Sequence, residues 1–165
     1  MSETRTRSDL APTALRQAFA RVPASIVAVC AEVDGERVGM AVSSFVPVSL
    51  DPPLVAFCVQ NTSTTWPRLR TAERIGISVL STEHSAAVGT LAAKDGDRFA
   101  GLVTATVGGH AVHVHGATLL LTTSIDNTVH AGDHQIVLLR VHEMQVYDTV
   151  EPVVFHGTTV RVLQP

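Results

Sequence analysis

Short apolar runs rich in β-branched residues, each bounded by turn-forming residues, fill most of this chain and restrict its fold strongly. Residues 25–33 form such a run, and the Asp34-Gly35 dipeptide that follows is typical of a tight hairpin turn. Residues 54–59 are apolar on both faces, which indicates a strand inside a sheet. Because the runs do not alternate with helical segments, the pattern predicts a mainly β fold, a β-barrel with peripheral helices, rather than a doubly wound α/β sheet.

Helical periodicity is confined to a few segments. Apolar residues recur at helical spacing from Pro12 to Val22, and Pro23 ends that run. Further helices are expected at residues 66–72 and, beginning with a cap at Ser81, up to residue 92. Other expected strands are residues 37–48, residues 75–80 and several from residue 102 onward, with turns at Gly108-Gly109, Gly116, Gly132-Asp133 and Gly157. We expect residues 1–11 to form a flexible tail and residues 12–165 to form one domain.

Composition excludes several classes of protein. With 45% hydrophobic and 16% charged residues, the 165-residue chain can bury a core and is not a disordered sequence. A formal charge of −3 without a basic cluster disfavours nucleic-acid binding. Apolar runs fall well short of the ~20 residues that a membrane helix needs. A polar N-terminus without a signal segment predicts a cytoplasmic protein, in which Cys30 and Cys58 are buried thiols rather than a disulfide.

Residues 39–53 place small and hydroxyl-bearing side chains at the end of a predicted strand. Gly39 permits close approach to the backbone, and Ser43, Ser44 and Ser49 supply hydroxyl groups and amides. Serines at a strand end are commonly turn residues. These residues alone are therefore compatible with either a turn or a ligand site.

A second polar segment, residues 60–65, reads Gln-Asn-Thr-Ser-Thr-Thr and precedes the predicted helix at Trp66. Hydroxyl groups and free amides in such a position suit a phosphate, although an ordinary helix-capping loop has the same composition. Lys94 lies in a charged loop at residues 94–98. It is either a cation for that phosphate or a solvated surface lysine.

Three histidines, His110, His113 and His115, lie close together in a predicted strand. His113 and His115 share one strand face and could chelate a metal ion. No Asp, Glu or Cys lies in the local run to complete the ligand set. We therefore expect no metal and interpret these histidines as solvent-facing side chains of an edge strand.

Two other histidines occupy turn positions, where functional residues are common. His134 follows the predicted turn at Gly132-Asp133, and His156 precedes Gly157. The sequence contains no nucleophile elbow, P-loop or zinc-protease motif, and no glycine-rich dinucleotide fingerprint. We therefore predict that a nucleotide cofactor, if one binds, does not bind in the Rossmann manner.

The order of several segments resembles the flavin reductase-like family. The matching segments are Gly39-Met40-Ala41-Val42-Ser43-Ser44-Phe45, Val48-Ser49-Leu50-Asp51-Pro52-Pro53-Leu54-Val55, residues 63–66, residues 74–80, Lys94 with Asp97-Arg98-Phe99-Ala100-Gly101, and Ala131-Gly132-Asp133-His134. The resemblance covers residues 15–163, which is nearly the whole chain. It implies the FMN-binding split-barrel fold. Many members of this family are the reductase component of a two-component monooxygenase.

The resemblance also implies roles for individual residues. Flavin ring contacts would come from Val42, Ser43 and Ser44, ribityl and phosphate contacts from Ser49, Asn61, Ser63 and Thr65, and a phosphate counter-charge from Lys94. His134 would face the nicotinamide of NADH or NADPH. Phe155 and His156 stand where the family has a Tyr-His-Arg-Gly stretch for the nicotinamide nucleotide, but here the tyrosine hydroxyl and the arginine are missing. The resemblance further implies a homodimer, and a hydride transfer that needs no catalytic acid–base residue.

Three hypotheses follow. The first is an NAD(P)H-dependent flavin reductase that transfers hydride to FMN or FAD and supplies reduced flavin to a partner monooxygenase. The second, motivated by the altered segment at residues 155–159, is a flavin carrier or sensor without reductase activity. The third is a small β-barrel that holds a metal through His110, His113 and His115. The sequence does not separate FMN from FAD, or NADH from NADPH.

Overall fold

The computed structural model describes residues 10–163, and strands dominate this part of the chain. The strands are β1 (Ala24–Ser25), β2 (Val27–Val33), β3 (Glu36–Val42), β4 (Val46–Leu50), β5 (Pro53–Gln60), β6 (Ile75–Val79), β7 (Thr104–Val107), β8 (Ala111–Val114), β9 (Leu119–Ala131), β10 (His134–Val146), β11 (Val153–His156) and β12 (Thr159–Val162). The tail predicted for residues 1–11 lies almost wholly outside the described residues.

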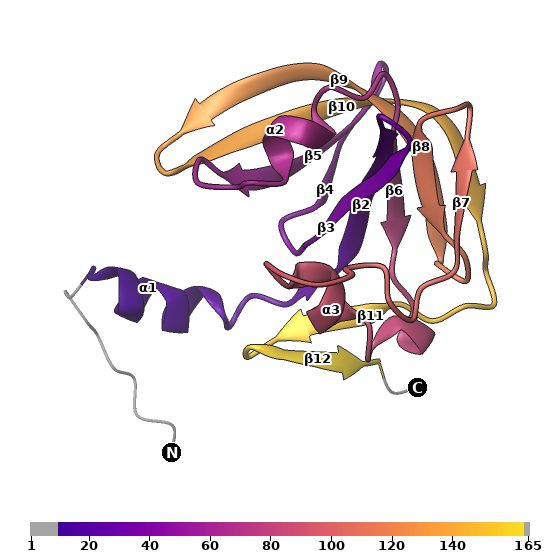
Figure 1. Cartoon of the computed structure of the whole chain (residues 1–165). Coiled ribbons are helices and arrows are strands. Elements are labelled where there is room, and N and C mark those ends of the chain that lie inside the picture. Colours follow the sequence, from indigo (N-terminus) through magenta and orange to yellow (C-terminus); the bar gives the residue numbers. More distant parts are fainter. Residues whose placement is uncertain (1–9, 164–165) are drawn as a thin grey trace.

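Two antiparallel sheets organise residues 10–163. The larger has nine strands in the order β4-β5-β10-β9-β6-β2-β8-β7, with β3 paired to β2, and the smaller has the order β1-β11-β12. Figure 1 shows the larger sheet curling into a barrel-like layer that does not close, with the helices at its periphery. The prediction of a mainly β fold with peripheral helices is confirmed.

The β2–β3 hairpin forms where the sequence predicts it. Asp34 and Gly35 both adopt positive φ angles, 53° and 77°, as a two-residue type I′ turn requires. Val33 then pairs with Glu36, and the register continues to Val27 opposite Val42. The local chemistry of one dipeptide therefore fixes the pairing of two strands.

The single strand predicted at residues 37–48 is wrong, because the chain turns at residues 43–45 between β3 and β4. The Ser44 hydroxyl accepts a hydrogen bond from the Cys58 amide at 2.8 Å and donates to the Cys58 carbonyl at 3.1 Å. A side chain that bonds backbone groups in this way competes with strand pairing. Beyond this turn the chain leaves β2, and β4 pairs with β5 instead.

Strand β2 is buried on both faces. Val27, Val29 and Ala31 belong to one hydrophobic cluster, whereas Ala28 and Cys30, with Ile26 just before the strand, belong to another. Successive side chains of a strand point to opposite faces, so one uninterrupted apolar run supplies two cores. Burying a valine side chain contributes about 1.5–3 kcal/mol, which makes this strand a main source of stability.

The helices are shorter than predicted. They are α1 (Pro12–Phe19), α2 (Trp66–Leu69), the 3₁₀ turn η1 (Thr82–His84) and α3 (Val88–Ala92). The helix predicted at residues 81–92 is divided because the buried His84 side chain bonds two backbone groups. Its Nδ1 accepts from the Ser81 amide at 3.0 Å, so Nε2 carries the proton and donates to the His115 carbonyl, also at 3.0 Å. None of the helices in the described residues is long and apolar enough to cross a membrane.

The interpretation of His113 as a solvent-facing side chain is wrong. His113 is 6% exposed, and its Nε2 lies 3.1 Å from the Leu121 carbonyl of β9. Loss of solvation on burial lowers the pKa of His113, and the Leu121 hydrogen bond only partly opposes that effect. His115 lies beyond the end of β8 and is exposed, so the strand brings only one of the two histidines into the core.

Burial of a neutral histidine predicts a loss of stability in acid. The unfolded chain protonates His113 near pH 6.5, whereas the folded chain does so at a lower pH. The contribution of neutral His113 to the unfolding free energy is therefore fully present above about pH 6.5, and it decreases as the pH falls toward the pKa of His113 in the folded chain. We expect the unfolding free energy of His113→Gln, measured in urea at pH 8 and pH 5.5, to fall less than that of wild type. His130→Gln, at an exposed position of β9, should fall as much as wild type. Equal falls for all three proteins would contradict the assignment.

Candidate functional site

A cavity of about 470 Å³ opens where four segments meet. These segments are the end of β3 with the following turn, the loop after β5, the loop after α3, and the start of β10. The lining residues are Met40, Ala41, Val42, Ser43, Ser44, Cys58, Val59, Gln60, Thr62, Ser63, Thr64, Thr65, Ala92, Lys94, Arg98 and His134. The volume is within the usual range for small-molecule sites.

Most of the residues predicted from the sequence meet at this cavity. Those that line it are Val42, Ser43, Ser44, Ser63, Thr65, Lys94 and His134. Ser49, Asn61 and His156 do not line it, and the contacts of all these predicted residues to a ligand stay predictions. Ser49 lies further along β4, and the Asn61 side chain bonds the Gly132 carbonyl at 3.2 Å instead.

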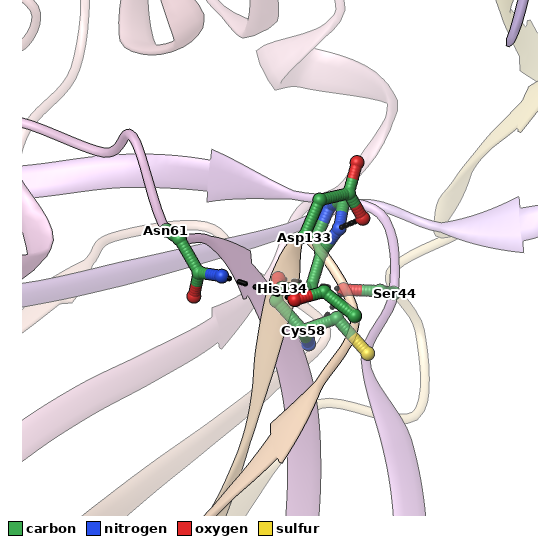
Figure 2. Close-up of polar contacts among 6 residues, drawn as sticks. Ser44, Cys58, Asn61, Asp133 and His134 are labelled. Carbon is green, nitrogen blue, oxygen red and sulfur yellow. Dashed lines mark hydrogen bonds and ion pairs between the residues drawn. The ribbon is translucent and has the colours of Figure 1, made fainter.

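The turn after β3 presents backbone amides and the Ser43 hydroxyl, but not the Ser44 hydroxyl. The Ser44 hydroxyl is occupied by its two bonds to Cys58, which tie this turn to β5 (Figure 2). Within residues 10–163, the amides of Ser43 and Ser44 donate no hydrogen bond. Unpaired amides of this kind are ready donors for a ligand with acceptor atoms.

The loop after β5 supplies a second group of free amides. The Ser63 amide donates to the Gln60 carbonyl at 3.0 Å, and the Ser63 hydroxyl accepts from the Trp66 amide at 3.1 Å. These two bonds shape the loop. Among the described residues, the amides of Thr62, Thr64 and Thr65 have no acceptor. Because α2 has only four residues, these donors, rather than a helix dipole, suit an anion.

Two cations line the cavity, and sequence reasoning identified only one of them as a site residue. Lys94 is exposed and makes no hydrogen bond or ion pair with the rest of the described chain. The Arg98 guanidinium donates through Nη1 to the Thr65 hydroxyl at 2.7 Å and to the Gly39 carbonyl at 3.1 Å. No carboxylate is among the lining residues. The cavity therefore favours an anionic ligand.

His134 is oriented by its neighbour. Its Nδ1 lies 2.6 Å from Oδ1 of Asp133 (Figure 2), and because a carboxylate only accepts, Nδ1 carries the proton and Nε2 remains free. The hydrogen bond and the charge of His134 lower the pKa of Asp133. The Asn61 amide also donates to the Asp133 carbonyl at 2.9 Å, which fastens this turn to the loop after β5.

The two cysteines differ in their surroundings. Both are free thiols, as predicted, and Cys30 is fully buried. Burial raises the pKa of Cys30 to about 12, so this thiol stays protonated. The prediction that Cys58 is also buried is wrong, because its side chain is half-buried at the border of the cavity.

Similarity to known proteins agrees with this geometry. The family described as "Flavin reductase like domain" matches residues 19–164. The chain belongs to this family. A flavin reductase of Pseudomonas putida is 35% identical over 151 residues, covering 91% of this chain and 89% of the relative. The reductase subunit HsaB of a flavin-dependent monooxygenase from Rhodococcus jostii is 27% identical over 132 residues, covering 80% and 68%.

Solved structures of the flavin reductase family have the same fold. The NADH:FAD oxidoreductase SgcE6 of Streptomyces globisporus C-1027, in complex with NAD and FAD fragments, superposes with a TM-score of 0.90 at 27% identity. The superposition covers 98% of each chain. The predicted split barrel is thereby confirmed, and so is the resemblance drawn from the serine-rich turn and the Gly132-Asp133-His134 segment.

The donor set of this flavin reductase family member fits a flavin nucleotide. Free amides of two loops surround a cavity with two cations and no carboxylate, which suits a phosphate at one end. A smaller apolar pocket of about 140 Å³ shares Ala41, Val42, Ser43 and Ala92 with it and adds Phe155. The structure therefore brings Phe155 to the border of the cavity, whereas His156 lines neither space.

The described residues contain no group of three or more His, Cys, Asp and Glu side chains that could hold a metal ion. His84 and His113 are both in the core and bond backbone carbonyls. The observed role of His113 is thus to pack and to satisfy a strand carbonyl.

Proposed function

We propose that the protein is an NAD(P)H-dependent flavin reductase that binds FMN or FAD in the cavity of about 470 Å³. The observation that carries the proposal is the donor set: unpaired amides from two loops, with Lys94 and Arg98 and without a carboxylate. Membership of the flavin reductase family agrees with it.

When bound, a flavin supplies the redox chemistry, because its ring accepts a hydride from a reduced nicotinamide, which leaves as NAD(P)⁺. The chain's own residues bind and orient. The amides of Ser43 and Ser44 contact the ring edge, and Lys94 and Arg98 neutralise the phosphate. His134 faces the nicotinamide with its free Nε2. No side chain needs to act as an acid or base, since hydride transfer depends on the placement of the two rings.

A spectral titration tests this function. Adding FMN or FAD to the purified protein should shift the flavin absorbance and quench its fluorescence. NADH or NADPH should then be oxidised only when flavin is present. Absence of any flavin binding, or rapid NADH oxidation without flavin, contradicts the proposal.

A second candidate function is a flavin carrier or sensor without reductase activity. The specific observation in its favour is the Phe155-His156-Gly157 segment, where Phe155 borders the cavity without a hydroxyl group and His156 does not line it. Tight FMN binding with no NAD(P)H oxidation would support this function. In that case Phe155→Tyr, combined with an arginine inserted after His156, should create activity. If it creates none, a degraded nicotinamide site does not explain the inactivity.

His134→Ala should weaken the use of the reductant more than the binding of flavin. His134 lines the cavity, its Nδ1 is held by Asp133, and its Nε2 is free. We expect the KM for NADH to rise about tenfold, equivalent to about 1.4 kcal/mol, with little change in the Kd for FMN. The matched control is His130→Ala, at an exposed position in β9 that does not line the cavity. A collapse of FMN binding in His134→Ala would instead assign His134 to the flavin.

We also propose that a monooxygenase component consumes the reduced flavin. The relative HsaB is the reductase subunit of such an enzyme. In this structure the cavity opens to solvent through exposed residues such as Ser43 and Thr64, which is compatible with release of the flavin. Rapid dissociation of reduced FMN, measured by stopped-flow fluorescence, would support a transfer role. Retention of reduced flavin through many turnovers would contradict it.

A homodimer is the proposed assembly, because α1 and the residues after it leave large apolar side chains exposed in the single chain. None of its residues is buried, and Phe19 and the nearby Val22 are 67% and 64% exposed. Figure 1 shows α1 projecting away from the barrel. A second copy of the chain would cover this apolar surface. Light scattering should give twice the mass of one chain, and Phe19→Ser should shift it toward the monomer, whereas Arg16→Ser, on the same helix, should not. A monomeric wild type overturns the proposal.

The proposed location is the cytoplasm. Both cysteines are free thiols, which suits a reducing compartment where NAD(P)H is also available. Cell fractionation with an antibody to the protein would test this. Recovery in a membrane or extracellular fraction would contradict it.

A further inference from the structure

A second cavity, of about 290 Å³, adjoins the proposed flavin site and has no role in the function argued above. It is lined by the start of β3, by α2 and by residues 96–99. Thr64, Thr65 and Arg98 line both cavities. The two spaces therefore meet at the end of the flavin site that holds the phosphate-binding cations.

The second cavity is rich in guanidinium groups. Arg37, Arg68 and Arg98 all line it, against one lining carboxylate, Asp97, which accepts a hydrogen bond from the Phe99 amide at 3.0 Å. Arg68 is paired with Glu36 at 2.9 Å, but the two side chains are 51% and 71% exposed. An exposed pair of this kind is weak and can exchange for a ligand phosphate. The cavity thus has an excess of positive charge.

Arg37 is held in place at one wall of this cavity. Its guanidinium carbon lies 4.9 Å from the centroid of the Phe99 ring, and Nη1 donates to the Thr104 hydroxyl at 2.9 Å. Phe99 is 7% exposed, and Gly39 lets its ring approach, because a Cβ at Gly39 would lie 2.8 Å from the ring. A fixed, planar guanidinium is a suitable surface for stacking an aromatic base.

We propose that this second cavity binds the adenosine monophosphate half of FAD. The inference rests on the proposed flavin site, because the shared Arg98 is where the FMN half of the dinucleotide would end and the second phosphate would begin. Arg98 and Arg68 would contact the second phosphate, and Arg37 would stack on the adenine. The AMP half also occurs in NADH and, with an added 2′-phosphate, in NADPH, so the reductant is the competing occupant. Because Arg98 lines both cavities and stands at the phosphate end of the flavin site, the AMP half of FAD continues directly into the second cavity, and we therefore favour FAD as the occupant.

The test compares FAD, FMN and riboflavin binding to wild type, Arg37→Gln and Arg68→Gln by fluorescence quenching. Each substitution should raise the Kd for FAD about tenfold, through loss of a charge-assisted phosphate contact at Arg68 or of the stacked guanidinium at Arg37, and leave the Kd for FMN and riboflavin unchanged. Arg70→Gln is the matched control, because Arg70 follows α2, is exposed and does not line the cavity, yet its loss changes the net charge equally. Unchanged FMN affinity also shows that each variant is folded.

The outcomes separate this inference from the proposed function. Equal losses for FMN and FAD, or no loss for either, overturn the second cavity as an adenylate site while flavin binding itself stands. A rise in the KM for NADH, measured with FMN as acceptor and without a change in FAD affinity, assigns the cavity to the reductant and also overturns the inference. Failure of wild type to bind any flavin overturns both.

Discussion

Gly76→Ala should strongly destabilise the fold. Gly76 lies in β6, and a Cβ at this position would be 2.2 Å from the Val112 carbonyl oxygen and 2.7 Å from the His113 ring. The nearest atom is backbone, so the clash cannot be relieved by moving a flexible side chain. Overpacking of a core typically costs about 1–3 kcal/mol, and we expect about 3 kcal/mol or more in urea unfolding. That is a large part of the about 5–15 kcal/mol that stabilises a typical domain.

Gly89→Ala is the matched control for this prediction. Gly89 lies in α3, and a Cβ there would meet no atom within 4 Å. Alanine is favoured over glycine inside a helix by about 0.5–1 kcal/mol, so this variant should be as stable as wild type or more stable. An unfolding free energy of Gly76→Ala within about 1 kcal/mol of the wild-type value would be below the usual cost of overpacking. It would show that the close approach of β6 and β8 does not restrict the side chain at residue 76.

Lys94→Ala should weaken FMN binding about tenfold, the lower limit for losing a hydrogen bond to a charged group. Lys94 lines the cavity, is exposed and has no partner within residues 10–163, so its removal leaves no group unsatisfied. Riboflavin lacks the phosphate and should bind equally well to the variant and to wild type. Fluorescence titration with both flavins measures the difference, and high salt should reduce it.

A matched variant controls for the change in net charge. Arg74→Ala removes one positive charge at a residue that does not line the cavity, and FMN should bind it as it binds wild type. Equal losses of FMN and riboflavin in Lys94→Ala would show that Lys94 does not contact the phosphate. The remaining cation, Arg98, is unsuitable for this comparison because its guanidinium also bonds Gly39 and Thr65.

Features decided by neighbouring residues could be predicted from the sequence. The Asp34-Gly35 turn needs only two residues that tolerate positive φ, and the structure has both. Residues 54–59, apolar on both faces, correctly indicated a strand inside a sheet, since β5 lies between β4 and β10. Seven of the predicted site residues meet at one cavity because the resemblance to the flavin reductase family located the loops that form it.

Features decided by contacts between distant segments could not be predicted in this way. The break after β3 depends on Cys58, 14 residues further along the chain. Its amide donates a hydrogen bond to the Ser44 hydroxyl, and its carbonyl accepts one from that hydroxyl. His113 is buried because β9 supplies the Leu121 carbonyl. Arg98 stood beside Lys94 in the same charged loop, but its place between two cavities follows from bonds to Gly39 and Thr65. No local pattern contains these pairings.

The engagement of Ser44 with Cys58 has a consequence for redesign of the site. Since the hydroxyl is consumed internally, the rim after β3 offers main-chain donors, and these survive when neighbouring side chains are exchanged. The ligand specificity of this rim therefore depends on the length and curvature of the chain between Val42 and Val46. Adding or deleting one residue there would move all of its main-chain donors together. Libraries that vary loop length would explore more ligand shapes there than libraries that vary residue type.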